Sequence, residues 1–132
     1  MRISRFRGQL KTDNGSHKKG DWVFGNLVSL KDGIKEHAHI YGAGEVVADT
    51  VGESTGELDK NKTEIFEGDI INVDFEKEYG GIKAQPSYIG VVEFKKGAFG
   101  IREKGKGTQF FFQHGLIKTV IGNIHDNPEL LK

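Results

Sequence analysis

The alternation of apolar and polar residues along the chain predicts many short β-strands. The clearest case is residues 63–75, TEIFEGDIINVDF, where a short apolar pair precedes a turn and a strand with Ile71, Val73 and Phe75 on one face. Further strands are expected at residues 3–10, 22–30, 37–41, 45–49, 88–94, 98–102, 108–113 and 118–124. No segment has the periodicity of an amphipathic helix of about ten residues or more. The pattern therefore predicts a mostly β fold.

Two segments interrupt this alternation. Residues 50–62, TVGESTGELDKNK, are expected to form a loop, which divides the chain into an N-terminal β-subdomain, 1–62, and a second subdomain, 63–132. Residues 76–87 are polar and rich in Gly, and they are expected to form an exposed connection. The strands of the second subdomain follow a Gly-Asp corner, which is typical of a small SH3-like β-barrel. Many unrelated proteins share such barrels, so this prediction concerns architecture alone.

The turn inside residues 63–75 consists of Glu67, Gly68 and Asp69. A tight corner between two strands favours positive φ at its Gly, and the Asp69 carboxylate is expected to accept backbone N–H bonds there. Near the end of the chain, Asn127 and Pro128 are expected to cap and begin a final helical turn.

Charge and composition narrow the function classes. The 132 residues contain 19 basic and 19 acidic side chains, and this neutral total does not favour a nucleic-acid-binding protein. The balance is uneven, because residues 1–20 carry six basic residues against Asp13, an excess of five, and the remainder carries the opposite excess. The chain has no Cys, which excludes disulfides. It also has no apolar run near the ~18 residues of a membrane helix, so a soluble cytoplasmic protein without membrane contact is expected.

The basic residues of the first segment support two interpretations. They can contact phosphates, with Phe6 or Trp22 stacking on a base, or they can form a solvated strand face or an arm that pairs with an acidic neighbouring subunit. In both, the arginines of the first strand face outward while Phe6 and Leu10 face a core. The neutral total favours the second interpretation. The residues concerned are Arg2, Arg5, Arg7, Lys11, Lys18 and Lys19.

Two groups of residues raise the question of metal binding. His37 and His39 lie on one face of a predicted strand, but a third ligand would have to come from His114, His125 or a carboxylate. A dense run of oxygen-bearing side chains lacks the spacing of an EF-hand calcium loop, and turn chemistry explains it better. This run comprises Asp59, Asn61, Glu64, Glu67 and Asp69. Neither group makes a metal site, so no metal and no cofactor are predicted.

No catalytic motif is present in the sequence. The chain lacks the phosphate-loop, dinucleotide-binding and zinc-protease patterns, and it has no Cys nucleophile. The aromatic run Phe110, Phe111 and Phe112 is interpreted as core and interface, with a ligand platform as the alternative. The sequence thus predicts no catalytic residues, although an active site assembled from distant residues stays possible in principle.

Several blocks of the sequence are similar to the YopX proteins. The longest is GELDKNKTEIFEGDII at residues 56–71, followed by VVEFKKGAFGI at 91–101 and VIGNIHDNPELL at 120–131. The opening segments FRGQ and DWVFGNLV also fit, so the resemblance covers nearly the whole chain in one order. It implies a self-associating, mostly β protein of phage or prophage origin, with no established activity and no catalytic residues. One departure is Lys62, which stands where the family often has Gly, and Lys at positive φ is uncommon.

Together these observations predict a non-enzymatic, self-assembling β-protein that acts through protein–protein interaction. Its expected partners are further copies of the chain and a phage or host protein. The alternative is a nucleic-acid-binding module that uses the basic N-terminal strand.

Overall fold

The computed structural model describes residues 5–75, 78–79, 82–83, 87–110 and 116–132. It divides the chain into two compact units, Met1–Gly56 and Glu57–Lys132, which are described separately here. Nearly all regular structure in both units is antiparallel β-sheet, so the predicted mostly β fold is confirmed. In the described part of the chain, no helix has the length and apolar character needed to cross a bilayer.

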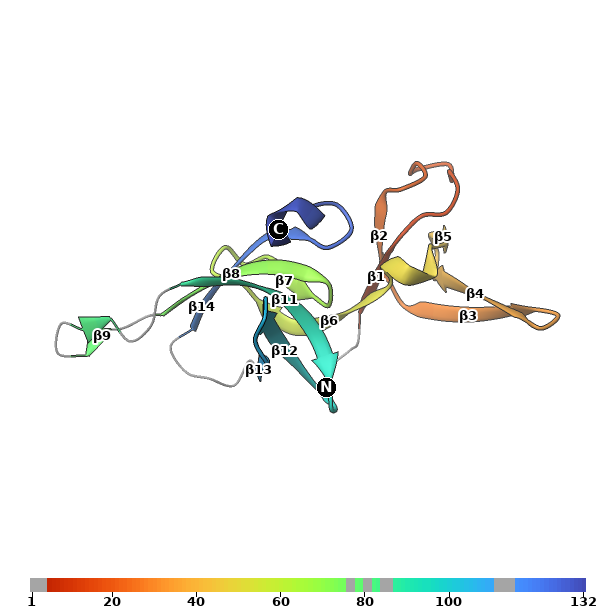
Figure 1. The fold of residues 1–132 in the computed structure, drawn as a ribbon. Helices are drawn as coiled ribbons and strands as arrows, with labels where there is room; N and C mark the ends of the chain where they lie inside the picture. Colours follow the sequence, from red (N-terminus) through yellow and green to blue (C-terminus); the bar gives the residue numbers. More distant parts are fainter. Residues whose placement is uncertain (1–4, 76–77, 80–81, 84–86, 111–115) are drawn as a thin grey trace. The chain divides into compact units, whose positions relative to one another are not determined.

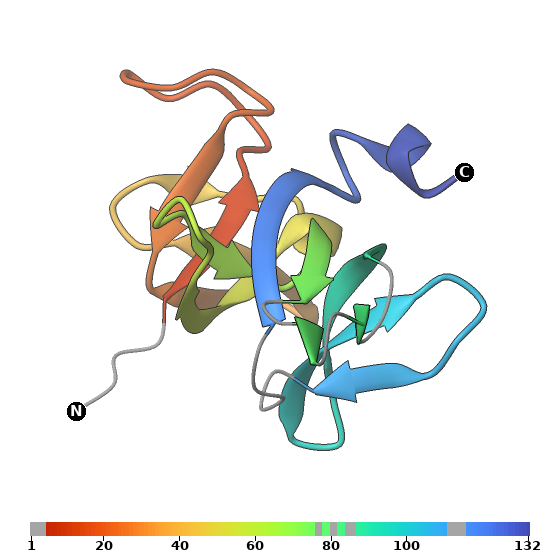
Figure 2. The same ribbon diagram turned by 90° about the vertical axis from the view of Figure 1, so that its left-hand side faces the viewer.

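The first unit begins with strand β1 (Phe6–Gln9), which lies between two antiparallel neighbours. On one side it pairs with β2 (Trp22–Gly25), and on the other with the start of β6 (Gly52–Leu58). The loop of residues 11–20 joins β1 to β2, and Figure 2 shows it in orange-red, standing beyond the ends of both strands. Side chains within this loop hold it together, since the Asn14 carboxamide oxygen accepts the N–H bonds of Ser16 and His17.

A second sheet of the first unit has the order β3-β4-β5. The strands β3 (Leu27–Asp32) and β4 (Lys35–Ile40) form a hairpin that leads away from β1 and β2 (Figure 1). The short strand β5 (Gly44–Glu45) pairs with the base of β4, and the 3₁₀ turn η1 (Ala48–Thr50) follows. The hairpin thus has a paired neighbour at its base and none along β3 among the described residues.

The core of the first unit sits between β1, β2 and the base of the hairpin. Four apolar side chains at most 4% exposed form it: Leu10, Val23, Ile40 and Val46. Gly8 lies against this cluster, where an added Cβ would come within 2.9 Å of the Val46 Cβ. On β2, Val23 is buried, whereas Trp22 is half-buried and Phe24 is 44% exposed. The predicted strand 22–30 in fact breaks at Gly25, whose φ of 150° separates β2 from β3.

The second unit is built on a sheet in the order β13-β12-β11-β8-β14. Its strands are β8 (Asp69–Phe75), β11 (Tyr88–Lys95), β12 (Ala98–Glu103), β13 (Thr108–Phe110) and β14 (Leu116–Asn123). Strand β8 lies between β11 and β14, with β14 bulged between Val120 and Gly122. The core comprises Ile65, Ile71, Val73, Val92 and Ile101, each at most 1% exposed. Residues 63–75 therefore supply much of this core.

Shorter elements complete the second unit. Strand β7 (Glu64–Phe66) lies beside the end of β6 and precedes the corner. The two-residue strands β9 (Glu78–Tyr79) and β10 (Ile82–Lys83) pair in the segment that was expected to be an exposed connection. The 3₁₀ turn η2 (Pro128–Leu131) ends the chain, and the Asn127 side chain does not cap it. Instead the Asn127 carboxamide oxygen accepts the N–H bond of Asn123.

The corner before β8 combines a left-handed backbone with a buried carboxylate. Gly68 has a φ of 91°, its N–H donates to the Val92 oxygen at 2.9 Å, and its oxygen accepts from Ile124 at 2.9 Å. The Asp69 carboxylate, 2% exposed, accepts the N–H bond of Phe66 at 2.8 Å. The corner thus joins β7 and β8 to their neighbours through hydrogen bonds of both residues.

Three expectations about architecture are not confirmed. Residues 50–62 are not a loop, because Gly52–Leu58 is strand β6, whose polar side chains Ser54 and Thr55 are buried at 5% exposure. Polar composition hid this strand, since its order comes from pairing with β1 and not from alternation. The SH3-like barrel is not confirmed, because the described strand order ends at β13 and β14 without a pairing that closes it. The predicted strand 45–49 is also shorter, and it passes into η1 at Ala48.

Candidate functional site

The outer face of the β3-β4-β5 sheet gathers polar and apolar side chains of mixed chemistry. Residues paired directly across antiparallel strands share a face, and the register pairs Val28 with His39, Leu30 with His37, and His39 with Glu45. These five residues therefore lie on one face. Ala38 and Ile40 alternate with the histidines along β4, and they pack into the core on the opposite face.

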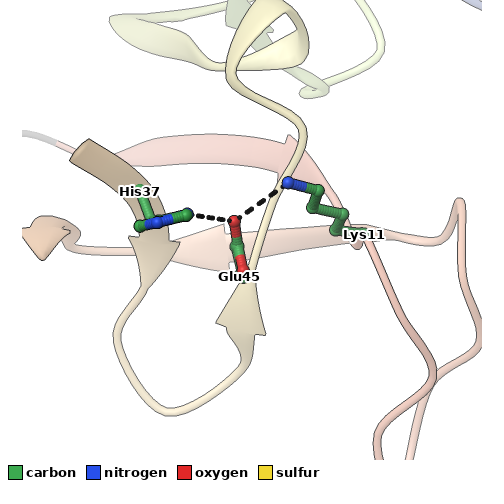
Figure 3. Close-up of polar contacts among 3 residues, drawn as sticks. All are labelled: Lys11, His37 and Glu45. Atoms are coloured by element: carbon green, nitrogen blue, oxygen red, sulfur yellow. Dashed lines mark hydrogen bonds and ion pairs between the residues drawn. The ribbon is translucent and has the colours of Figure 1, made fainter. Parts of the chain in front are cut away.

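A carboxylate at the base of this sheet binds two basic side chains. The Glu45 Oε2 lies 2.9 Å from His37 Nδ1 and 3.2 Å from the Lys11 ammonium, with the two groups on either side of it (Figure 3). The backbone reinforces this arrangement, because the Lys11 N–H donates to the Glu45 carbonyl at 3.0 Å. The hydrogen bond with His37 and then that from Lys11 lower the pKa of Glu45. The cluster joins β5 to the start of the loop after β1 and to the middle of β4.

An open groove lies on the same sheet, next to this cluster. Its volume is about 380 Å³, and its lining is Val28, Leu30, His39, Ile40, Tyr41, Gly42, Ala43 and Gly44. Apolar atoms dominate the lining, and His39 and Tyr41 supply its polar groups. Tyr41 is 77% exposed and Leu30 is 49% exposed. Such a groove can accept an apolar side chain more readily than a charged ligand.

Comparison with known proteins identifies the family of the chain. A family model described as YopX protein matches residues 9–132, which is nearly the full length. The chain belongs to the YopX family. None of the curated proteins matches it. A solved structure, the crystal structure of protein EF1440 from Enterococcus faecalis, is similar with a TM-score of 0.50 and 25% sequence identity. The likeness covers 98% of this chain and 99% of that one, so it extends over both units.

In this YopX-family structure the predicted basic set does not form one exposed surface. Arg7 is only 8% exposed, with its guanidinium 4.6 Å from the centre of the Trp22 ring, so the expectation that it faces outward is wrong. Arg7 lies on the face of β1 opposite to Gly8 and the core, and the Trp22 ring contacts its guanidinium there. Arg5 is exposed and stacks 4.9 Å over Phe24, and Lys11 is bound to Glu45.

The other members of the basic set lie elsewhere. Lys18 and Lys19 are exposed in the loop of residues 11–20, where their backbone N–H groups donate to Asp21 and Asp13. Arg2 lies outside the described residues. Arg5 thus lies directly before β1 and Arg7 within it, and the two differ in exposure.

The two groups considered for metals have other interactions. His37 and His39 share a face, and His37 Nδ1 is directed to Glu45. Across the described residues, no group of three or more His, Asp or Glu side chains is placed to hold a metal ion, and His114 lies outside them. In the oxygen-rich run, the Asp59 carboxylate accepts N–H bonds from Asn61, Thr63 and Val120 at 2.8–2.9 Å. The bonds from Asn61 and Thr63 are contacts within the turn, whereas the bond from Val120 reaches strand β14, which local turn chemistry does not predict.

The aromatic run is described only in part. Phe110 belongs to β13 by its backbone, while its side chain, together with Phe111 and Phe112, lies outside the described residues.

Sequence reasoning did not single out Leu30 and Tyr41, which line the groove, or Ile34 at the tip of the hairpin. The signal present in the sequence was Ile34 directly after Asp32-Gly33, because a β-branched apolar residue is unusual in a tight hairpin turn.

Proposed function

We propose that this chain is a non-enzymatic, self-assembling β-protein of a phage or prophage, which acts through protein–protein contacts in the cytoplasm of a bacterial cell. Membership in the YopX family supports it, together with the division of charge between the first 20 residues and the rest. Opposite net charges on two parts of one chain favour contacts between copies, because each copy offers both signs.

The observation that carries this proposal is the exposure of apolar side chains on the β3–β4 hairpin. Leu30, Ile34 and Tyr41 are 49%, 101% and 77% exposed, and Leu27, which pairs with Ile40 on the opposite face, is 38% exposed. A two-stranded hairpin has little stability of its own in water, and an exposed apolar patch commonly marks an interaction site. Contact with another protein would cover these side chains and give β3 a partner.

Three carboxylates with lowered pKa values support a role without catalysis. A general acid or base at neutral pH needs a raised pKa, whereas the pKa values of Glu45, Asp59 and Glu93 are lowered. A hydrogen bond from the Thr108 hydroxyl is the main cause at Glu93, with Arg102 Nε also donating at 3.0 Å. Hydrogen bonds from other residues of the chain therefore favour the ionised form of each carboxylate, which is consistent with a structural role.

The mass of the protein in solution tests the proposal. Light scattering coupled to size-exclusion chromatography, across micromolar concentrations, is expected to give a mass of several chains. Because opposite charges contribute, we expect this mass to fall when the salt concentration rises to about 1 M, where the Debye length is about 3 Å. A mass equal to one chain at every concentration and salt level would overturn self-assembly.

A nucleic-acid-binding module is the second candidate, and one observation favours it. Arg5 and Phe24 are both exposed and stacked, which resembles the guanidinium and aromatic surfaces that bind unpaired bases. Lys18 and Lys19 are exposed in the adjoining loop and can bind phosphate.

Fluorescence anisotropy with single- and double-stranded DNA and RNA tests this candidate. Binding would weaken steeply with salt, and Lys18→Ala with Lys19→Ala would reduce both the affinity and the salt slope. The matched control is Lys104→Ala with Lys106→Ala, which removes two exposed lysines from the second unit. No binding at low salt, or equal losses in the two double variants, would exclude the basic segment as a nucleic-acid site.

A further inference from the structure

Ile34 at the tip of the β3–β4 hairpin is out of place for a turn residue. It is 101% exposed and forms a two-residue loop with Gly33, whose φ is 66°. Asp32 and Lys35 close the ladder on either side of this loop. Two-residue hairpin loops favour Gly, Asn, Asp and Ser, because their backbones and side chains suit the turn. Loop chemistry thus explains Gly33 but gives no reason for an exposed β-branched apolar side chain beside it.

The groove on the outer face of the same hairpin has the complementary character. Its lining is mostly apolar, and its volume of about 380 Å³ exceeds what one isoleucine side chain occupies. Val28 and Leu30 on β3 supply apolar surface, while Tyr41 and His39 border it. An aliphatic side chain that enters here leaves water and brings no polar group of its own.

Within one chain the tip cannot reach the groove. Six residue pairs, from Leu27 with Ile40 to Asp32 with Lys35, form the hairpin ladder. At about 3.4 Å per residue, this extended ladder holds the tip roughly 10 Å beyond Leu30 and roughly 15–20 Å from residues 40–44, all of which line the groove. The Ile34 side chain therefore cannot fill the groove of its own chain, and it can enter only the groove of another copy.

We propose that Ile34 of one copy inserts into the groove formed by Val28, Leu30, His39 and Tyr41 of the next copy. This inference rests on the self-assembly proposed above and names its contact. Tip and groove are different surfaces, so the contact is heterologous, and repetition generates a closed ring or a filament. Charge suits the same arrangement, because Asp32 and Lys35 flank Ile34 while Lys11 and Glu45 lie next to the groove.

Two single variants separate the tip from the groove. Ile34→Ser removes the inserted side chain and leaves the groove intact, and Leu30→Asp places a charge in the groove and leaves the tip intact. Both side chains are exposed, so each variant is expected to melt with the wild type. The controls are Ile34→Leu, which keeps an aliphatic tip, and Leu130→Ser, which removes an exposed aliphatic side chain from η2.

Light scattering at micromolar concentration measures the outcome. Ile34→Ser and Leu30→Asp are each expected to have the mass of one chain, while Ile34→Leu and Leu130→Ser keep the wild-type mass. An equimolar mixture of Ile34→Ser with Leu30→Asp is expected to have the mass of two chains and no more. In that mixture one intact tip meets one intact groove, and the chain of contacts stops there.

The failures of the two proposals are distinguishable. A wild-type protein with the mass of one chain overturns self-assembly and this contact with it. A wild-type assembly whose mass both variants retain leaves self-assembly standing and overturns the insertion of Ile34. A mixture that stays at the mass of one chain also overturns it. Should Leu30→Asp melt well below the wild type, Tyr41→Ser at a 77% exposed position replaces it in the same mixture.

Discussion

The hairpins β3–β4 and β11–β12 have the same local construction and different surroundings. Each joins six residue pairs through a two-residue loop. The loop of the first hairpin is Gly33 with Ile34, of which Gly33 has a positive φ. The loop of the second is Lys96 with Gly97, and both of these residues have a positive φ. Strand β11 also pairs with β8, and β12 pairs with β13. Strand β3, in contrast, has β4 as its sole neighbour among the described strands.

This difference shows that hairpin hydrogen bonds alone do not decide the role of a hairpin. Val92 and Ile101 face each other across β11–β12 at 1% exposure, whereas Leu30 on β3 is 49% exposed. Burial supplies most of the stability of a sheet, because isolated hairpins are marginal in water. The β11–β12 hairpin is therefore packed on both sides within the second unit, whereas the β3–β4 hairpin leaves more of its apolar surface in contact with water.

The largest contrast is expected from truncating one apolar residue in each hairpin. Ile101→Ala should lower the free energy of unfolding by about 2–5 kcal/mol, because it leaves a cavity in a packed core. Leu30→Ala should change it by about 0.5 kcal/mol or less, since half of that side chain is in water. Urea unfolding followed by circular dichroism measures both values. Equal losses for the two variants would show that β3 is as deeply packed as β12.

A second contrast concerns the two glycines at positive φ, Gly68 and Gly33. Val at either position is strained by about 1–3 kcal/mol. Gly68 is buried, and both its backbone groups are hydrogen-bonded at the corner, so Gly68→Val should lower the melting temperature of the protein. Gly33 has open space around it at an exposed tip, so Gly33→Val should be relieved by local opening. Thermal melts decide, and a Gly68→Val protein that melts with wild type would mean that the corner is not strained.

A third contrast is the dependence of stability on pH. Burial opposes the ionisation of Asp59, but N–H bonds from Val120, Thr63 and Asn61 outweigh it and hold its pKa below the usual value. A lowered folded-state pKa stabilises the protein above the unfolded-state pKa of about 3.9, and this contribution is lost as pH falls through the folded-state value.

Asp59→Asn should therefore cost about 1–3 kcal/mol at pH 7, since charged acceptors make the stronger hydrogen bonds. The difference between this variant and wild type should shrink below about pH 4. Melting curves at pH 7 and pH 3 test the sign. A difference that is the same at both pH values would show that the charge of Asp59 does not contribute.

The smallest effect on stability is expected from a substitution of Glu45. Like Asp59 in the second unit, Glu45 is a carboxylate with a lowered pKa, and it lies in the β3-β4-β5 sheet of the first unit. Its side chain is 29% exposed, and its ion pair with Lys11 is open to solvent. Glu45→Gln should leave the melting temperature close to that of wild type and loosen β5 locally. Faster amide hydrogen exchange at Lys11, whose N–H donates to the Glu45 carbonyl, is the expected readout. A large fall in melting temperature would instead assign this cluster to the core of the first unit.

Local chemistry in the sequence determined the strands of the second unit and their corner. The alternation around Ile71 and Val73 predicts β8, and both side chains are fully buried there. Gly between two short strands predicts positive φ, and Gly68 has it. Lys62 also adopts a φ of 65°, in a turn where Asp59 accepts the N–H bonds of Asn61 and Thr63. These features depend on neighbours within a few positions, which is why the sequence reveals them.

Tertiary structure alone decided which faces are covered and which stay open. The alternation of the sequence assigns Arg5 and Arg7 to the same strand face. In the structure, however, Arg7 is buried against Trp22 and Arg5 is exposed over Phe24. Strand β6 is polar, and it is ordered because β1 pairs with its start across more than forty residues. The groove of the outer face and the bare tip at Ile34 likewise depend on which strands find a neighbour. Burial depends on partners distant in the chain, and no local pattern of residues specifies those partners.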